Sequence, residues 1–316
     1  MSAARRVETL GEPAVRGGPV TGPGRVRLDV RDDAAFAAGH APGSGHLPRR
    51  EFAARRAELP PRECPVLVLA DQPDEAAAAA RELEARGFLD VAWLGQPLAE
   101  VAEGRSERGP AARLWRPAPF LAEVLPGVRA ALGPGAHAAA DLAAGSGREA
   151  VHLALAGFEV EAWDHAPEAL GRAAELARRC GVAIHARLAD LAAPGGAGSG
   201  AAHGADTPLP AGRYALITVF RFLARALLPA IERALAPGGW LVYETYRAGQ
   251  ERFGRPRSAR FLLRAGELSS AFPTLSVVRY EEPAPAGGPL TARLLARKPP
   301  GDPPRSPASS ASSPGS

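Results

Sequence analysis

Short apolar runs alternate with alanine-rich, amphipathic stretches through the first third of the chain. The apolar runs predict strands at Val26–Val30, Pro65–Ala70 and Phe88–Leu94. The stretches between them predict helices at Ala34–Ala38, Arg50–Leu59 and Asp74–Arg86. The last helix is followed by Gly87, which suits a helix C-cap. Because strands that alternate with helices form parallel sheets, we expect a small α/β domain here.

The same alternation continues in the rest of the chain. Five strands are expected near residues 138–142, 158–163, 182–187, 213–220 and 239–246, with helices between the first several. Two more, Thr274–Glu282 and Leu290–Arg297, are joined by the Pro/Gly-rich segment 283–289, which has no room for a helix. These two strands are therefore expected to be antiparallel neighbours. The pattern predicts a second, larger α/β unit with a Rossmann-like sheet of seven strands.

Changes in composition indicate where these units begin and end. We expect a flexible N-terminus over residues 1–24, the small domain over 25–97, a linker over 98–112, the larger domain over 113–299 and a disordered tail over 300–316. The Gly-rich segment 194–207 is a low-complexity loop within the larger domain.

The overall composition is that of a globular protein and excludes several classes of partner. Hydrophobic residues make up 46% of the 316 residues, enough for packed cores. The net charge of +4 comes from dispersed charges without a basic stripe interleaved with aromatics, so no nucleic-acid partner is expected. The cysteines, Cys64 and Cys180, and the seven histidines have no metal-binding spacing. Without a signal peptide or a membrane-length apolar run, the chain is expected to be cytoplasmic with no membrane partner.

A glycine turn flanked by two acids carries the clearest chemical signal. The predicted strand at 138–142 contains Asp141 and leads into Gly145-Ser-Gly147, and Asp164 follows 17 residues later at the end of the next strand. Small turn residues let backbone N–H groups approach a ligand closely, and a carboxylate at the second strand tip accepts hydrogen bonds from ribose hydroxyls. The unit therefore predicts a site for an adenosine-type cofactor.

Asp141 decides which cofactor is favoured. The turn also satisfies the relaxed dinucleotide fingerprint, so an NAD-dependent oxidoreductase is an alternative. A dinucleotide places its pyrophosphate near this turn, where Asp141 would repel it. S-adenosylmethionine instead has an ammonium that pairs with a carboxylate, and a carboxylate that suits the helix N-terminus. The acid before the glycines therefore favours S-adenosylmethionine.

With these residues in place, the second unit resembles class I S-adenosylmethionine-dependent methyltransferases, most closely the tellurite-resistance-related branch that acts on small molecules. The resemblance implies a methionine-end loop that includes Asp141, and a ribose contact at Asp164. It places Asp190 and Leu191 beside the adenine. The full set of expected cofactor residues is Asp141, Ala143, Gly145, Gly147, Asp164, His165, Asp190 and Leu191. Ala143 stands where this family usually has its first glycine, a departure that bears on cofactor affinity.

The first unit resembles rhodanese-like domains through Leu28-Asp-Val-Arg31, Gly39-His-Ala-Pro-Gly43 and Leu47-Pro48. In that family a cysteine after the central strand carries a persulfide. Here that position is Ala70, followed by the acidic loop Asp71-Gln-Pro-Asp-Glu75, whereas a reactive thiolate needs an electropositive setting. The domain is therefore expected to be inactive as a sulfurtransferase.

Methyl transfer needs orientation of the acceptor and, for some acceptors, a base. Arg221, after the fourth strand, and Glu244 and Tyr246, at the end of the fifth, are the candidate catalytic residues. Arg221 could pair with a small anionic acceptor, and the resemblance to the methyltransferase family, together with the fused rhodanese-like domain, implies a thiol or heavier chalcogen as the acceptor. The alternative is a non-catalytic protein that senses the cofactor or docks a protein partner through the rhodanese-like domain.

Overall fold

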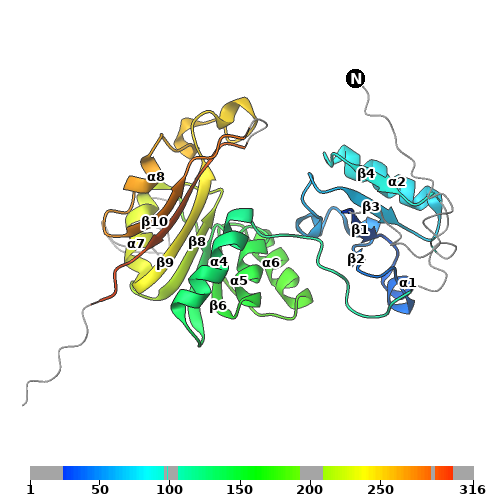
Figure 1. Ribbon diagram of the computed structural model, residues 1–316, viewed down its shortest axis with the longest axis horizontal. Helices are drawn as coiled ribbons and strands as arrows, with labels where there is room; N and C mark the ends of the chain where they lie inside the picture. Colours follow the sequence, from blue (N-terminus) through cyan, green and yellow to red (C-terminus); the bar gives the residue numbers. More distant parts are fainter. Residues whose placement is uncertain (1–23, 96–97, 99–105, 193–208, 286–288, 302–316) are drawn as a thin grey trace, which may run out of the picture. The chain divides into compact units, whose positions relative to one another are not determined.

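The computed structural model describes residues 24–95, 98, 106–192, 209–285 and 289–301. The expectations for the flexible N-terminus, the Gly-rich loop and the C-terminal tail fall almost wholly outside these residues. The chain forms two compact units, Met1–Arg116 and Pro117–Ser316 (Figure 1). In the described part of the chain, no helix is both long and apolar enough to cross a bilayer.

The first unit is built on a parallel four-stranded sheet. Its strand order is β2-β1-β3-β4, and each neighbouring pair is parallel. The strands are β1 (Val26–Asp29), β2 (Gly45–His46), β3 (Val66–Leu69) and β4 (Val91–Trp93). The helices are α1 (Asp33–Ala38) and α2 (Pro73–Ala85), with the 3-10 turns η2 (Arg49–Glu51) and η3 (Arg56–Glu58). β3 is buried along its whole length, which its uninterrupted apolar sequence predicted.

The helix expected over Arg50–Leu59 does not form. The segment folds instead into η2 and η3, with Arg55 between them in a non-helical conformation. The Arg55 guanidinium pairs with Glu51 at 2.8 Å and with Glu58 at 2.6 Å, so one side chain holds both turns. Both pairs are local, at i,i+4 and i,i+3 spacing, and they hold the two turns together without a continuous α-helix.

Residues expected to be a linker belong to the first unit. Glu107 forms a two-way backbone bridge with His40, with N–O distances of 3.0 and 2.9 Å. The Ala112 N–H donates to the Ser44 carbonyl, and Leu114 is buried in the core of this unit. The boundary between the compact units therefore follows Arg116, a few residues later than the composition indicates.

The second unit contains the expected seven-stranded sheet. Its strand order is β10-β11-β9-β8-β5-β6-β7, in which β11 is antiparallel to both of its neighbours and the other pairs are parallel. The strands are β5 (His137–Leu142), β6 (Phe158–Asp164), β7 (His185–Leu188), β8 (Tyr214–Phe220), β9 (Leu235–Tyr246), β10 (Ser276–Glu281) and β11 (Thr291–Arg297). The antiparallel pairing of the last two strands confirms the prediction from their short connection.

Helices cover both faces of this sheet (Figure 1). The helices are α4 (Pro119–Leu132), α5 (Arg148–Leu155), α6 (Pro167–Arg179), α7 (Leu228–Ala234) and α8 (Glu267–Ser270), with the 3-10 turns η4 (Arg225–Leu227), η5 (Gln250–Arg252) and η6 (Ala259–Phe261). Trp240 and Val242 pack with α4, α5 and α6, whereas Leu241 and Tyr243 pack with α7 and α8. This alternation along β9 divides the core into two layers and leaves the carboxyl ends of the parallel strands for a site.

Candidate functional site

The glycine turn lies between β5 and α5, where three residues adopt left-handed backbone conformations. They are Ala143 (φ 57°), Gly145 (φ 56°) and Gly147 (φ 79°). Gly147 meets a second constraint, because a Cβ atom there would lie 2.5 Å from the Cβ of Ala173 on α6. Gly145 has open space around it, so its requirement is conformational alone. The loop is thus held close to α6 while its backbone stays accessible.

Asp164 ends β6 and binds the glycine turn. Its Oδ2 accepts a hydrogen bond from the Gly145 N–H at 2.8 Å, and its Oδ1 accepts one from the Ala166 N–H at 2.9 Å. The residue is only 6% exposed. Each carboxylate oxygen has two lone pairs, so Asp164 retains capacity to accept further hydrogen bonds from a ligand.

Asp141 is buried at the carboxyl end of β5, with 2% exposure. Its Oδ1 accepts a hydrogen bond from the Thr218 hydroxyl at 2.8 Å, whereas its buried Oδ2 accepts no hydrogen bond of standard geometry within the described structure, and the Ala150 N–H in the first turn of α5 favours the ionised carboxylate. Burial, together with the nearby Glu149 carboxylate, raises the pKa of Asp141 well above its usual value. An unsatisfied buried oxygen is costly, so this atom is suited to a cationic or hydrogen-bond-donating ligand.

Glu149, in the first turn of α5, is a site residue that the sequence interpretation missed. Its charge raises the pKa of Asp141 and, less strongly than burial, that of Glu244. Its Oε1 also accepts a hydrogen bond from the Ala118 N–H at 3.1 Å, at the N-terminus of α4. An acid two residues after the second turn glycine was the available signal. No group of three acidic, histidine or cysteine residues in the described part of the chain is arranged to hold a metal ion.

The remaining expected cofactor residues lie at the ends of β6 and β7. His165 is largely exposed, with its Nδ1 atom 3.3 Å from Asp164 Oδ1. Asp190 is exposed and accepts a hydrogen bond from the Ala192 N–H at 2.9 Å. Leu191 is buried in the core layer beside α7. The Ala189 N–H donates to the Asp164 carbonyl, which brings the end of β7 to the end of β6.

Arg221 and Tyr246 meet at the carboxyl ends of β8 and β9. The Arg221 guanidinium donates to the Tyr246 hydroxyl at 3.1 Å, and it lies 5.8 Å from the centre of the tyrosine ring. Arg221 has a φ of 58°, an unusual left-handed conformation for a residue other than glycine. Its N–H donates to the Glu244 carbonyl at 2.8 Å. Strained backbone of this kind is concentrated at functional sites, where it aims a side chain.

Glu244 is 3% exposed and forms an ion pair with Arg293 of β11, with 3.0 Å between Oε2 and Nε. Burial raises the pKa of Glu244, and the charges of Arg293 and Arg221 partly offset that increase. Arg293 also lies over the ring of Phe120 on α4, 5.8 Å from its centre. The three candidate catalytic residues therefore lie at one edge of the sheet, with Glu244 held inside and Arg221 facing solvent.

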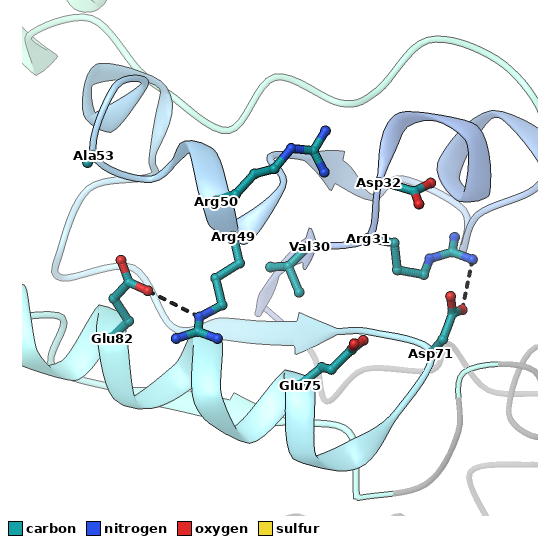
Figure 2. Close-up of a pocket in the computed structure, with 9 residues that line it drawn as sticks. All are labelled: Val30, Arg31, Asp32, Arg49, Arg50, Ala53, Asp71, Glu75 and Glu82. Carbon is teal, nitrogen blue, oxygen red and sulfur yellow. Dashed lines mark hydrogen bonds and ion pairs between the residues drawn. The ribbon is translucent and has the colours of Figure 1, made fainter.

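The first unit has a charged cleft of about 580 Å³ beside the loop that follows β3 (Figure 2). Asp71, Glu75 and Glu82 line one side, whereas Arg31, Arg49 and Arg50 come from the β1–α1 connection and η2. Ion pairs join Arg31 to Asp71 and Arg49 to Glu82, each at 3.2 Å.

Ala70, at the rhodanese cysteine position, is buried at the carboxyl end of β3. Cys64 lies before the amino end of the same strand and is not among the residues that line the cleft. The cleft thus contains charged groups that can bind polar ligands, but no thiol that could carry sulfur.

Taken together, the carboxyl ends of the strands in the second sheet carry two buried acids, Asp141 and Asp164, beside the glycine turn, and a hydrogen-bonded arginine–tyrosine pair. A model of the tellurite resistance protein TehB family matches residues 118–195, which contain the glycine turn and both flanking acids. Among solved structures, TehB from Haemophilus influenzae is 18% identical with a TM-score of 0.43, covering 56% of this chain and 62% of that chain. A putative sarcosine dimethylglycine methyltransferase from Galdieria sulphuraria is 16% identical with a TM-score of 0.45, covering 57% and 84%.

The first unit has relatives of its own. Thiosulfate sulfurtransferase GlpE from Pseudomonas putida strain F1 is 36% identical over 94 residues, covering 27% of this chain and 83% of the relative. GlpE from Pseudomonas putida strain GB-1 matches with the same identity and coverage. Both resemblances predicted from the sequence are confirmed. The chain belongs, through its first unit, to the GlpE family of rhodanese-like proteins, and it joins that unit to a TehB-related class I methyltransferase fold.

Proposed function

We propose that the second unit binds S-adenosylmethionine at the β5–α5 turn and transfers its methyl group to a small nucleophilic acceptor. The observation that carries this proposal is the buried, unpartnered Oδ2 of Asp141 above the glycine turn. An ammonium group would satisfy that oxygen, whereas a pyrophosphate would face Asp141 and Glu149 together. The same observation disfavours a nicotinamide dinucleotide.

The residues of this site match the groups of the cofactor from its methionine end to its adenine. Asp141 would hold the ammonium, and the N-terminus of α5 would receive the carboxylate of the methionine end. Asp164 would accept from the ribose hydroxyls, with His165, Asp190 and Leu191 toward the adenine. The bound cofactor supplies the electrophilic methyl group, and the chain supplies orientation and exclusion of water.

On the acceptor side, Arg221 and Tyr246 would orient the nucleophile. The exposed guanidinium and the hydroxyl it contacts can both bind an anion, which supports an anionic or thiolate acceptor. Glu244 would receive a proton where the acceptor carries one, since burial raises the pKa of its carboxyl. A thiolate or heavier chalcogen acceptor needs no such base.

We propose a second role for the first unit, as a binding module without sulfur transfer. The observation that favours it is the combination of Ala70 with a charged cleft at the place where the rhodanese family carries its persulfide. A small protein or peptide partner with charges of both signs would fit the two walls of this cleft. If the second unit binds its cofactor without turnover, this role would extend to the whole chain.

Calorimetric titration with S-adenosylhomocysteine tests the cofactor site. Asp164→Asn should weaken binding by roughly 1.5–3 kcal/mol, one to two decades in affinity, because a charged hydrogen-bond acceptor is lost. Glu159→Gln is the matched control, since it removes a carboxylate from the exposed, opposite end of the same strand. Absence of binding to the wild-type chain would refute the proposal. Saturable NAD binding that survives Asp141→Asn would favour the oxidoreductase instead.

A further inference from the structure

The segment that follows β9 has a much larger excess of basic over acidic residues than the chain as a whole. Residues 247–264 contain six arginines and one acid, Glu251, whereas the whole chain has 38 basic and 34 acidic residues. The segment includes η5 and η6 and leads toward α8. Figure 1 draws it in amber beyond the arrowhead ends of the central strands.

This segment is anchored at both ends. The Leu263 N–H donates to the Tyr246 carbonyl at 2.9 Å, and the Ala248 N–H donates to the Leu263 carbonyl at 2.9 Å. Leu263 itself is fully buried. Gln250, which is 4% exposed, accepts a hydrogen bond from the Leu290 N–H at 2.7 Å. Backbone hydrogen bonds and buried side chains therefore hold both ends of the segment in place.

Arg225 holds the C-terminal part of the same segment. Its guanidinium donates to the carbonyls of Arg260 and Leu262, each at 2.9 Å, and it is held by the Glu267 carboxylate. The outward side chains of residues 252–261 are thus presented by an ordered backbone.

Those outward side chains are arginines and phenylalanines. Phe253 is 46% exposed and Phe261 is 40% exposed. The Arg260 guanidinium lies 4.5 Å from the centre of the Phe261 ring. Within the described residues, no acidic side chain forms an ion pair with the arginines of this surface. We call its members, Arg252, Phe253, Arg255, Arg257, Arg260 and Phe261, the Arg–Phe platform.

Such a surface matches a ligand that combines several negative charges with flat apolar faces. Uncompensated guanidinium groups bind phosphate through paired N–H donors. Exposed rings with neighbouring guanidinium groups provide stacking surfaces for bases. Both features occur together in a nucleotide chain whose bases are unpaired.

We propose that the Arg–Phe platform binds single-stranded nucleic acid. An anionic membrane also attracts arginine, but insertion of Phe261 into lipid would bury the Arg260 guanidinium that covers its ring, at a large desolvation cost. Stacking of a base needs no such burial. The glycine, proline, serine and alanine between the two rings add little apolar surface for insertion.

The segment that carries the platform begins directly after Tyr246 and returns to it, because the Leu263 N–H donates to the Tyr246 carbonyl. The interaction does not depend on the proposed methyl transfer, since none of the platform residues belongs to the expected cofactor or catalytic set. It can therefore be tested without cofactor.

Fluorescence anisotropy with a labelled single-stranded RNA of about 15 nucleotides, within the range of single-stranded site sizes, is the direct test. The full chain should bind saturably. Phe253→Ala/Phe261→Ala should weaken binding by about tenfold or more through lost stacking. Arg255→Gln/Arg257→Gln should weaken it and reduce the slope of log affinity against log salt by about 1.4, from about 0.7 for each phosphate contact.

Arg81→Gln/Arg233→Gln is the matched control, since it removes two exposed arginines from α2 and α7. This variant should bind within twofold of wild type, and unchanged thermal unfolding should accompany all the variants. Competition by mononucleotides as effective as that by the oligonucleotide would show that the site recognises a single nucleotide rather than a chain, contrary to the proposal. Equal weakening in the control, no saturable binding, or binding to phosphatidylserine vesicles in place of RNA would also overturn it.

Discussion

Two loops of this chain occupy comparable places in their sheets but carry different functional groups. Each leaves the carboxyl end of a buried parallel strand and leads into a helix. The loop after β5 has three left-handed residues and a buried acid without a partner for one oxygen. The loop after β3 begins with Ala70 and continues into an acidic stretch, whose first acid, Asp71, is paired with Arg31.

This difference teaches that backbone architecture persists where reactive groups have been lost. The strand, loop and helix of the first unit match the rhodanese pattern, yet the atom that would carry sulfur is missing. In the second unit, unsatisfied polar groups are still present at the strand ends. The first unit also has buried side-chain atoms without a hydrogen-bond partner among the described residues, on His40, Ser44 and Arg86, so the guide to chemistry is the place of such a group, here an acid at the end of a strand beside the glycine turn.

The largest expected effect concerns Gly147. Gly147→Ala places a Cβ atom 2.5 Å from the Cβ of Ala173 and retains a left-handed φ. Overpacking and backbone strain together should lower the free energy of unfolding by about 2–4 kcal/mol and abolish binding of S-adenosylhomocysteine. Urea denaturation and calorimetry measure both.

Gly145→Ala is the matched control for this prediction, since it shares the left-handed φ but has open space. It should cost about 1 kcal/mol. Equal effects of the two substitutions would show that the contact with α6 is unimportant, and the comparison between the loops would then lose its steric basis.

The next prediction concerns the proton on Asp141. Its folded-state pKa is raised by burial and by Glu149, so its contribution to stability is fully present below the unfolded pKa of about 3.9 and is lost as pH rises through the folded value. Binding of an ammonium group favours the ionised form. Cofactor affinity should therefore rise up to about tenfold per pH unit below the folded pKa and then level off.

Calorimetry in buffers of different ionisation enthalpy should detect proton release on binding to the wild-type chain. Asp141→Asn should bind more weakly at high pH and release no proton from this position. Identical proton release by the two proteins would assign the effect to another group.

The loop after β3 can be tested by returning a thiol to it. Ala70→Cys should give a thiol with a pKa at or above about 8.5, because Asp71 and Glu75 oppose the thiolate. Adding Asp71→Asn and Glu75→Gln should lower that pKa, by about one unit. Absorbance at 240 nm follows the thiolate. A thiol pKa already well below 8.5 in the single variant would show that the cleft arginines dominate, and would weaken the view that this loop has lost its electropositive setting.

The smallest expected effect is at Ala143. Its left-handed φ costs about 1–2 kcal/mol relative to glycine, while glycine adds unfolded-state entropy worth about 0.5–1 kcal/mol. Ala143→Gly should therefore stabilise the chain by about 0.5 kcal/mol, measured by urea denaturation. A destabilising result would mean that the methyl group makes a packing contact that outweighs its strain.

Much of the architecture was predictable because hydrophobic periodicity is a local signal. The strands of both sheets, with the exception of the two-residue β2, and the antiparallel pairing of β10 with β11 follow from runs and connection lengths in the sequence. The helix expected near Arg50–Leu59 was wrong, and the local pattern gave no warning, because the ion pairs of Arg55 have the i,i+4 and i,i+3 spacing that an α-helix also uses. The packing of Leu114 on the first unit was missed because it is a tertiary contact that no local pattern contains.

The residues of the candidate site could be predicted where a sequence motif identifies them, but not where their role depends on burial or exposure in the folded chain. Asp141, Gly147 and Asp164 could be named from spacing alone. Glu149 could not be assigned a role, because its influence on Asp141 depends on burial. Likewise, arginines and phenylalanines near 252–261 were visible in the sequence, but their exposure is what distinguishes a surface from a core segment. The expectation of no nucleic-acid partner, which rested on finding no basic stripe interleaved with aromatics, therefore passed over the Arg–Phe platform.

The contact between Gly147 and Ala173 has a consequence for how this protein can evolve. The two positions share one small volume, so a larger residue at 147 requires glycine at 173, whereas a larger residue at 173 cannot be compensated at 147, where glycine already stands. Ala173→Gly is accordingly expected to suppress only part of the steric effect of Gly147→Ala, since a contact of 2.9 Å with the Cα atom of residue 173 remains, and it cannot relieve the left-handed backbone. The effect of a substitution at position 147 in the turn thus depends on the residue at position 173 in α6, although the two are far apart in the sequence.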